Sequence, residues 1–216
     1  MKPPIWLAID PGNNKTGFAY FNEAYKLLDV GHLDVEHLDS IHNKRHAIGA
    51  GLGALKYYLE RQYGDRPIRV ICEEPIMQGK ANQQMQRLLG VAETFFDHPF
   101  HYYNPLTVKA TMGSGRFEKP EVAKAVSTYV AMSATEGAQK AYLSAVDKKN
   151  WDMTDAIAIG LTHFIKLNLI PKIAKEKKRA SQKSKPKKAH SKESAKAHLG
   201  RLSRKASAVD LKIQNG

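Results

Sequence analysis

The first 21 residues contain the pattern that most constrains the fold. Residues 5–9 are apolar and rich in β-formers, and the run ends in one carboxylate, Asp10, before a Pro-Gly turn. The run is too short for an ordinary helix and predicts a buried strand, and residues 16–21 predict the returning strand of a hairpin. Asp10 is therefore expected at the tip of a central strand. There an Asp either caps its own turn or meets a cation, because an unpaired charge is costly.

Further strands and helices are expected to alternate as far as about residue 170. An amide-rich segment at 78–86 leads into a helix that ends near Phe96. Asp39 is the expected N-cap of the first helix, and Leu143 and Val146 are expected to face the core. This order predicts an α/β fold with a mixed sheet of about five strands flanked by helices. The other strands are expected at 26–33, 68–75 and 100–104, and the other helices at 39–62, 121–132, 137–146 and 150–168.

Other carboxylates fall at the ends of predicted elements. Glu73 and Glu74 close one strand, and because side chains alternate between faces, only one of them can share a site with Asp10. Asp152 and Asp155 are three residues apart at the start of the last helix, so both can face one ion. Acidic residues in a first turn also favour the helix dipole without any ligand. The ligand site is supported by the number of acids at element ends, where an α/β sheet builds its crevice.

Three other patterns have both a functional and a structural explanation. The segment 105–119 carries Lys109, Arg116 and Lys119 around Gly-Ser-Gly, which suits a phosphate backbone or a solvated loop between helices. His42 and His46 stand four apart, and without a third ligand nearby they are expected to be solvent-exposed. The helix ending near Phe96 has a broad apolar stripe, which fits either the core or a partner subunit. Its members are Met85, Leu88, Leu89, Ala92, Phe95 and Phe96.

The charge of the chain is concentrated at its C-terminal end. The net charge is +13, and residues 172–216, here called the tail, hold 15 Lys and Arg against 3 acidic residues. The rest holds 19 against 18 and is almost neutral. A basic segment with few aromatics is expected to be mostly disordered and to bind nucleic acid or another anionic surface. We therefore expect one domain at 1–170 and a disordered basic segment at 171–216.

The cysteine content and hydropathy suggest where the protein works. The one cysteine, Cys72, has no partner for a disulfide, which favours a reducing compartment. No signal pattern and no apolar run of bilayer length are present in this sequence. We expect a soluble cytoplasmic protein that has no membrane partner.

These blocks together resemble the RuvC family of Holliday-junction resolvases over residues 5–166. Asp10-Pro-Gly with Thr16-Gly17, then Cys72-Glu73-Glu74, the 109–119 segment and the block 152–163 occur in the family's order and approximate spacing. The last block is the most specific, because the family pattern resembles D-x-x-D-A-x-A-x-A-x-T-H. Gly160 departs from it, and Ile76 and Met77 stand where family members place an aromatic wedge. The basic tail is similar to a phage-type or divergent member rather than to the bacterial pattern.

The resemblance implies an RNase H-like fold, a homodimer and two-metal hydrolysis of branched DNA in a bacterial or phage-infected cell. It implies that Lys109 and Lys119 are active-site and DNA-contacting lysines, in a loop one residue shorter than usual. Arg116 in the same segment is expected to be a further DNA contact, on its charge and position. The resemblance also implies four acidic metal ligands, namely Asp10, Glu73, Asp152 and Asp155.

The chemistry of such a site selects its cofactor. Clustered carboxylates repel one another and need a divalent cation, and oxygen ligands select Mg²⁺ or Mn²⁺, with two ions in each active site. Two alternatives remain open at this stage. One is a less selective nuclease that cuts flaps, forks or RNA–DNA hybrids. The other is a basic nucleic-acid-binding module without catalysis.

Overall fold

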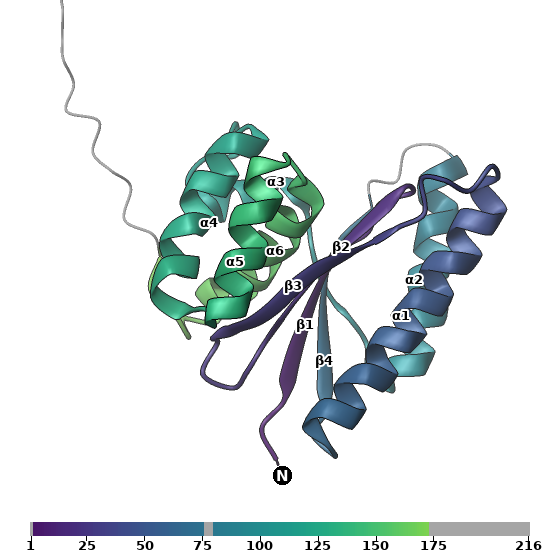
Figure 1. Cartoon of the computed structure of the whole chain (residues 1–216), viewed down its shortest axis with the longest axis horizontal. Helices are drawn as coiled ribbons and strands as arrows, with labels where there is room; N and C mark the ends of the chain where they lie inside the picture. The colour runs from purple at the N-terminus through teal and green to yellow at the C-terminus, as the bar shows by residue number, and fades with distance from the viewer. Residues whose placement is uncertain (1, 76–79, 173–216) are drawn as a thin grey trace, which may run out of the picture. The chain divides into compact units, whose positions relative to one another are not determined.

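The computed structural model describes residues 2–75 and 80–172, and a mixed sheet organises them (Figure 1). β2 runs antiparallel to both of its neighbours, whereas β1, β4 and β5 are parallel to one another. This confirms the predicted five-stranded mixed sheet, with β1 at its centre. The strand order is β3 (Leu27–Asp34), β2 (Lys15–Phe21), β1 (Ile5–Asp10), β4 (Ile68–Glu73) and β5 (His101–Tyr103).

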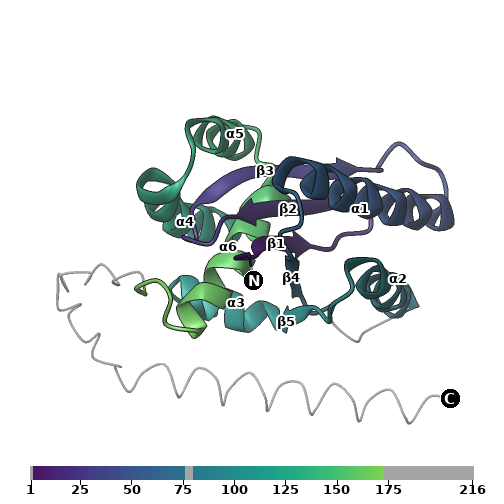
Figure 2. The same cartoon turned by 90° about the horizontal axis from the view of Figure 1, so that it is seen from below.

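Helices cover both faces of the sheet (Figure 1, Figure 2). One face packs against α1 (Ile41–Tyr63) and α2 (Lys80–Phe96). The other face packs against α6 (Trp151–Lys166), which contacts β1 and β2 directly. The outer helices of that layer are α3 (Pro105–Met112), α4 (Lys119–Ser133) and α5 (Glu136–Asp147).

Alternation along β1 supplies both halves of the core. Leu7 and Ile9 join the cluster under α1 and α2, whereas Ala8 joins the cluster under α6. α6 lies very close to the sheet at Gly160, where an added Cβ would stand 2.4 Å from a ring carbon of Phe21 and 3.3 Å from the Cβ of Ala8. The Phe21 ring takes the space that an alanine methyl would need, which explains the glycine at this position.

Several predicted details of the helices are wrong. Ser40, not Asp39, caps α1, because the Ser40 hydroxyl accepts the N–H of Asn43 at 3.1 Å. Leu143 is 60% exposed, and α5 instead buries Tyr142 and Ala145 on the face that it turns to the core. Val146 is partly buried against that core, as expected. His42 and His46 are exposed, as predicted.

The first half of the expected loop at 105–119 is helix α3. Asn104 caps it, with its side-chain oxygen accepting the N–H of Leu106 at 2.9 Å, and Pro105 occupies the first turn. Proline is favourable there because its missing N–H has no partner in a helix anyway. Only residues 113–118 remain as a connection to α4, so the lysine at 109 is held on a regular element.

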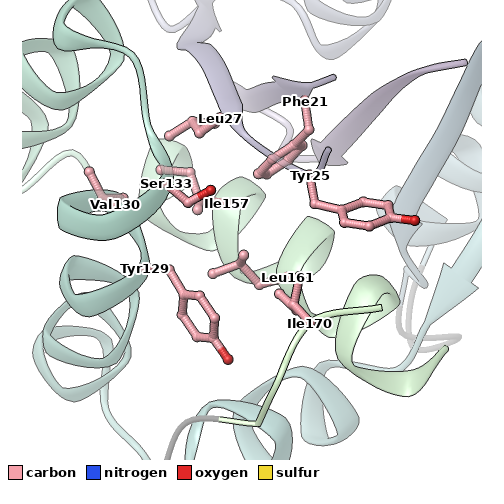
Figure 3. A pocket seen from close by; sticks show the side chains of 9 residues that line it. All are labelled: Phe21, Tyr25, Leu27, Tyr129, Val130, Ser133, Ile157, Leu161 and Ile170. Atoms are coloured by element: carbon pink, nitrogen blue, oxygen red, sulfur yellow. The ribbon is translucent and has the colours of Figure 1, made fainter. Parts of the chain in front are cut away.

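A small apolar cavity of about 30 Å³ lies between α4, α6 and the β2–β3 connection (Figure 3). Its lining includes Tyr25, Val130 and Leu161. It has room for about one water molecule, so it is a packing void rather than a nucleotide site. Within the described residues, no helix is long and apolar enough to span a membrane. The predicted disordered segment 171–216, apart from its first two residues, lies outside the described ranges.

Candidate active site

Asp10 and Glu73 end two neighbouring parallel strands. β1 and β4 are in register with Ile9 opposite Cys72, so Asp10 and Glu73 follow as the next pair at the same sheet edge. Asp10 comes two residues after Ala8, and Glu73 two after Ile71, and both of those residues pack under α6. Both carboxylates therefore point to the α6 face. Of the two neighbouring glutamates, Glu73 is therefore the one that lies on the same face as Asp10, whereas Glu74 is exposed.

The turn after Asp10 is closed by Thr16, which is fully buried. Its hydroxyl donates to the carbonyl of Gly12 at 3.1 Å and lies 3.4 Å from the Gly12 nitrogen. An added Cβ on Gly12 would stand 2.1 Å from the carbonyl oxygen of Lys15, so the turn requires glycine there. This local structure fixes the direction in which β1 delivers Asp10.

α6 brings the second pair of carboxylates to the same edge. Asp152 and Asp155 lie in its first turns, and both are partly buried. The backbone of Asp152 rests on β2, where an added Cβ on Gly17 would be 2.0 Å from its carbonyl oxygen. Gly17 is opposite Asp10 in the β1–β2 register. The four predicted acidic residues are thus brought together by β1, β4 and α6.

A lysine completes this group. Lys119 is the first residue of α4, and its Nζ lies 2.8 Å from Oδ2 of Asp155. A capping box holds the start of α4, in which the Glu118 N–H donates to the Glu121 side chain at 2.9 Å. Neither this box nor the Asn104 cap of α3 was predicted, although Asn104-Pro105 is a recognisable helix start. Glu118 is not a usual N-cap residue, so its box has no clear signal in the sequence.

The charges of these side chains shift one another's pKa values. Burial, and then the charges of Asp155, Glu73 and Asp152, raise the pKa of Asp10 well above its ordinary value, while Lys119 lowers it in part. Burial and the charge of Asp155 raise the pKa of Glu73 to about 7. Burial also raises the pKa of Asp155, against the opposing effect of Lys119.

The two lysines predicted at the site both act on it. Burial disfavours the charge of Lys119, but its hydrogen bond to Asp155 and the other carboxylates give it a pKa above the ordinary value. Lys109, in the last turn of α3, lowers the pKa of both Glu73 and Asp155. Arg116 is exposed in the 113–118 connection. Ile76 and Met77 lie outside the described residues.

The donor set fits a hard divalent cation, because buried carboxylates that raise one another's pKa are stabilised by added positive charge. Within residues 2–75 and 80–172, no three carboxylate, imidazole or thiol groups are close enough to hold one ion in this conformation. Unneutralised carboxylates repel one another, and Lys119 draws Asp155 to itself. The four-ligand metal site therefore stays a prediction.

The sheet order 3-2-1-4-5, with helices on both faces, defines an RNase H-like α/β fold, as predicted. Among solved structures, the chain is similar to Thermus thermophilus RuvC, with 20% identity over 76% of this chain and 96% of that chain, at a TM-score of 0.50. It is also similar to T. thermophilus RuvC in complex with a Holliday junction substrate, with 21% identity over 77% and 96%, at a TM-score of 0.54. No family model matches the sequence, and no curated protein matches it. The likeness is one of fold.

Proposed function

We propose that this chain is a metal-dependent endonuclease that resolves four-way DNA junctions. One observation carries the proposal: carboxylates from β1, β4 and α6 converge at one sheet edge beside Lys119. Carboxylates that converge and have raised pKa values are common at functional sites. Elsewhere they are rare, because burying an unpaired charge costs free energy of folding. The similarity of fold to RuvC supports the same chemistry, because these acids are the ones that the sequence resemblance assigns as metal ligands.

In this proposal each residue has a defined task. Asp10, Glu73, Asp152 and Asp155 would supply oxygen ligands from β1, β4 and α6, whose packing fixes where their backbones lie. The chemistry expected from bound Mg²⁺ or Mn²⁺ is activation of a water and stabilisation of the leaving 3′-oxygen.

The cations in the site would act on the DNA backbone. Lys119 Nζ lies 2.8 Å from Oδ2 of Asp155 and is placed to hold the scissile phosphate once Asp155 is neutralised. Lys109 and the exposed Arg116 extend this positive rim along α3 and the turn that follows it. Such contacts position a phosphate backbone without reading its sequence.

The choice of a four-way junction as substrate is supported by the similarity to T. thermophilus RuvC, whose structure holds a Holliday junction substrate, and it needs a direct test. The protein should be incubated with a four-way junction, a matched duplex, a fork and an RNA–DNA hybrid, each with and without Mg²⁺. We expect paired cuts in the junction that require Mg²⁺. Equal cutting of forks or hybrids would favour the less selective nuclease, and Mg²⁺-independent binding without cutting would favour the non-catalytic module.

The site assignment has its own experiment. Asp10→Asn, Glu73→Gln, Asp152→Asn and Asp155→Asn should each lose metal-dependent cutting while retaining junction binding, because binding depends on the cations. Glu74→Gln is the matched control, since Glu74 adjoins Glu73 but is exposed and leaves the strand on the other face. Full activity in Asp155→Asn would overturn the assignment.

We also propose a homodimer. Coordinated cuts on two strands require two active sites, and a two-fold dimer is the usual solution. The apolar residues of α2 support this: the stripe members Met85, Leu89 and Ala92 are buried in the core, whereas the stripe member Phe95 is 52% exposed and Val91, outside the stripe, is 54% exposed. These two exposed side chains, here called the α2 face, are the proposed contact.

A further inference from the structure

We propose that His32 is a positioning residue for the acidic site. Through Asn150 it holds the first turn of α6, and therefore Asp152 and Asp155, at a set position relative to Asp10. The proposal rests on the proposed function, but its test includes metal binding, which can be measured without any DNA cleavage. The sequence pattern alone does not connect His32 with Asn150.

The β-sheet register places His32 in one row with the site. Asp10 pairs with Gly17 across β1 and β2, and Gly17 pairs with His32 across β2 and β3. Residues directly opposite each other in antiparallel strands project to the same face. His32 follows Val30 by two residues, and Val30 belongs to the core under α6, so the whole row faces α6.

The first turn of α6 sits on this row. The carbonyl oxygen of Asp152 occupies the space that a side chain on Gly17 would need. Gly17 thus leaves the space that the start of α6 occupies. Its two neighbours in the row, Asp10 and His32, lie on either side of it. Asp10 is a member of the acidic group, and His32 holds the helix from the opposite side.

That hold is a hydrogen bond between side chains that are 118 residues apart in the sequence. The amide Nδ2 of Asn150 lies 3.0 Å from Nδ1 of His32. Because an amide nitrogen only donates, Nδ1 of His32 is the acceptor of this bond. The ring and the helix start are therefore joined in one defined orientation.

The Asn150 side chain makes this bond in place of the usual N-cap hydrogen bond. It is the N-cap of α6, where an Asn side chain ordinarily accepts a backbone N–H of the first turn. Here it makes no such bond, and its Oδ1 is buried with no hydrogen-bond partner among the described residues. The Asn150 side chain is thus directed to His32 on β3 and not to the backbone of its own helix.

Charged groups lie near the far side of His32. Its Nε2 is 4.0 Å from Oδ2 of Asp34, which is too far for a hydrogen bond, and Asp34 pairs with Lys15 at 3.5 Å. Lys15 starts β2, directly after the turn that follows Asp10. The direct tie between β3 and the start of α6 is therefore the bond between His32 and Asn150.

The test compares two substitutions at His32. His32→Leu removes the acceptor at similar bulk, whereas His32→Asn retains an acceptor near the position of Nδ1. For His32→Leu we expect Mn²⁺ affinity, measured by electron paramagnetic resonance, and kcat on a junction each to fall about 10-fold, the effect typical of residues that orient metal ligands. The KM for the junction should be unchanged, and His32→Asn should restore both quantities to within about twofold.

Two controls separate positioning from loss of structure. His98→Leu makes the same substitution between α2 and β5, at the opposite sheet edge, and should leave Mn²⁺ affinity unchanged. The losses in His32→Leu and Asn150→Ala should not add in the double variant, because both break one bond.

Unchanged Mn²⁺ affinity in His32→Leu overturns the proposal. So does equal loss in His32→Leu and His32→Asn together with a lower melting temperature, because it indicates a purely structural role. Wild-type protein that binds Mn²⁺ but cuts no branched DNA overturns the proposed function instead, and the Mn²⁺ affinities of the variants still decide the role of His32.

Discussion

The carbonyl oxygen of Asp152 lies directly against the α-carbon of Gly17, so that a methyl group there would stand only 2.0 Å from it. The contact joins β2 to the first turn of the helix that carries two of the four carboxylates. The atom in the way is backbone, which cannot rotate aside as a flexible side chain can. Glycine at this position is therefore a requirement of the site as well as of the strand.

Gly17→Ala is expected to lower the free energy of unfolding by about 1–3 kcal/mol, the usual cost of forcing extra atoms into a packed interior. Urea denaturation followed by circular dichroism measures it. DNA cleavage should fall as well, because α6 must shift away from Asp10.

Gly53→Ala provides the matched control. Gly53 lies in α1, and an added Cβ there meets nothing within 4 Å. Removing a glycine from an open helix position should raise stability by about 0.5–1 kcal/mol. If both variants changed stability in the same direction, the contact with Asp152 would not be what makes Gly17 necessary.

The acidic site should make stability depend on pH when no divalent metal is present. Glu73 has a pKa raised from 4.5 to about 7, so between these values the folded state binds more protons than the unfolded state. Stability is then highest below about pH 4.5 and falls as the pH rises to about 7. Asp10 and Asp155 have raised pKa values and act in the same direction.

Glu73→Gln removes the titrating group and should isolate its contribution. In the presence of a chelator, the variant should be more stable than wild type by about 1–3 kcal/mol at pH 8, and about equal to it at pH 4. Thermal denaturation across this pH range measures the difference. If the difference in stability between the variant and wild type did not vary with pH, ionisation of Glu73 would not destabilise the folded protein.

Much of this site could be predicted from the sequence, because its acids stand at the ends of elements with clear periodicity. The run before Asp10 and the helix after Asn150 are of this kind, and strand alternation reduced the choice to Glu73 or Glu74. Segment 105–112 was misread because Lys109 and the following Gly-Ser-Gly suggested a loop, although Asn104-Pro105 is a regular helix start.

The link between His32 and Asn150 lay beyond sequence reasoning for a different reason. The two residues are 118 positions apart, and neither type nor spacing connects them. Their contact depends on the β2–β3 register and on where α6 crosses the sheet, and both are tertiary features. Likewise, Gly160 is explained only when the ring of Phe21 is seen beneath it.

The α2 face gives a prediction about assembly. Phe95→Glu places a charge among the exposed apolar groups of α2 and should convert the proposed dimer to a monomer, because an unpaired buried charge is costly. Light scattering at micromolar concentration measures the mass. Junction cutting should change from paired cuts to single nicks.

Leu143→Glu is the control, since Leu143 is 60% exposed on α5, in the other helical layer. It should leave the mass unchanged. A monomer mass for wild-type protein, with and without DNA, would contradict the dimer itself, whereas a dimer that persists in Phe95→Glu would place its interface elsewhere.

The tail is expected to contribute affinity without selectivity. Residues 172–216 hold 15 Lys and Arg against 3 acidic residues, whereas the rest of the chain holds 19 against 18. Bound phosphates release counterions, so the logarithm of the binding constant falls linearly with the logarithm of salt concentration, by about 0.9 per phosphate neutralised. Removing the tail should weaken binding to duplex and junction alike and make this slope shallower.

Junction selectivity should survive the truncation, because the shape of the substrate would be recognised by the dimeric body and by the cations near the site. Affinities for junction and duplex, measured at several salt concentrations for intact and truncated protein, test both statements. Lys109→Ala in the intact chain is the comparison, since it should lower the slope by about one unit at most. A slope that the truncation leaves unchanged would mean that the tail does not contact phosphates, and a protein partner would then be the better candidate for its charge.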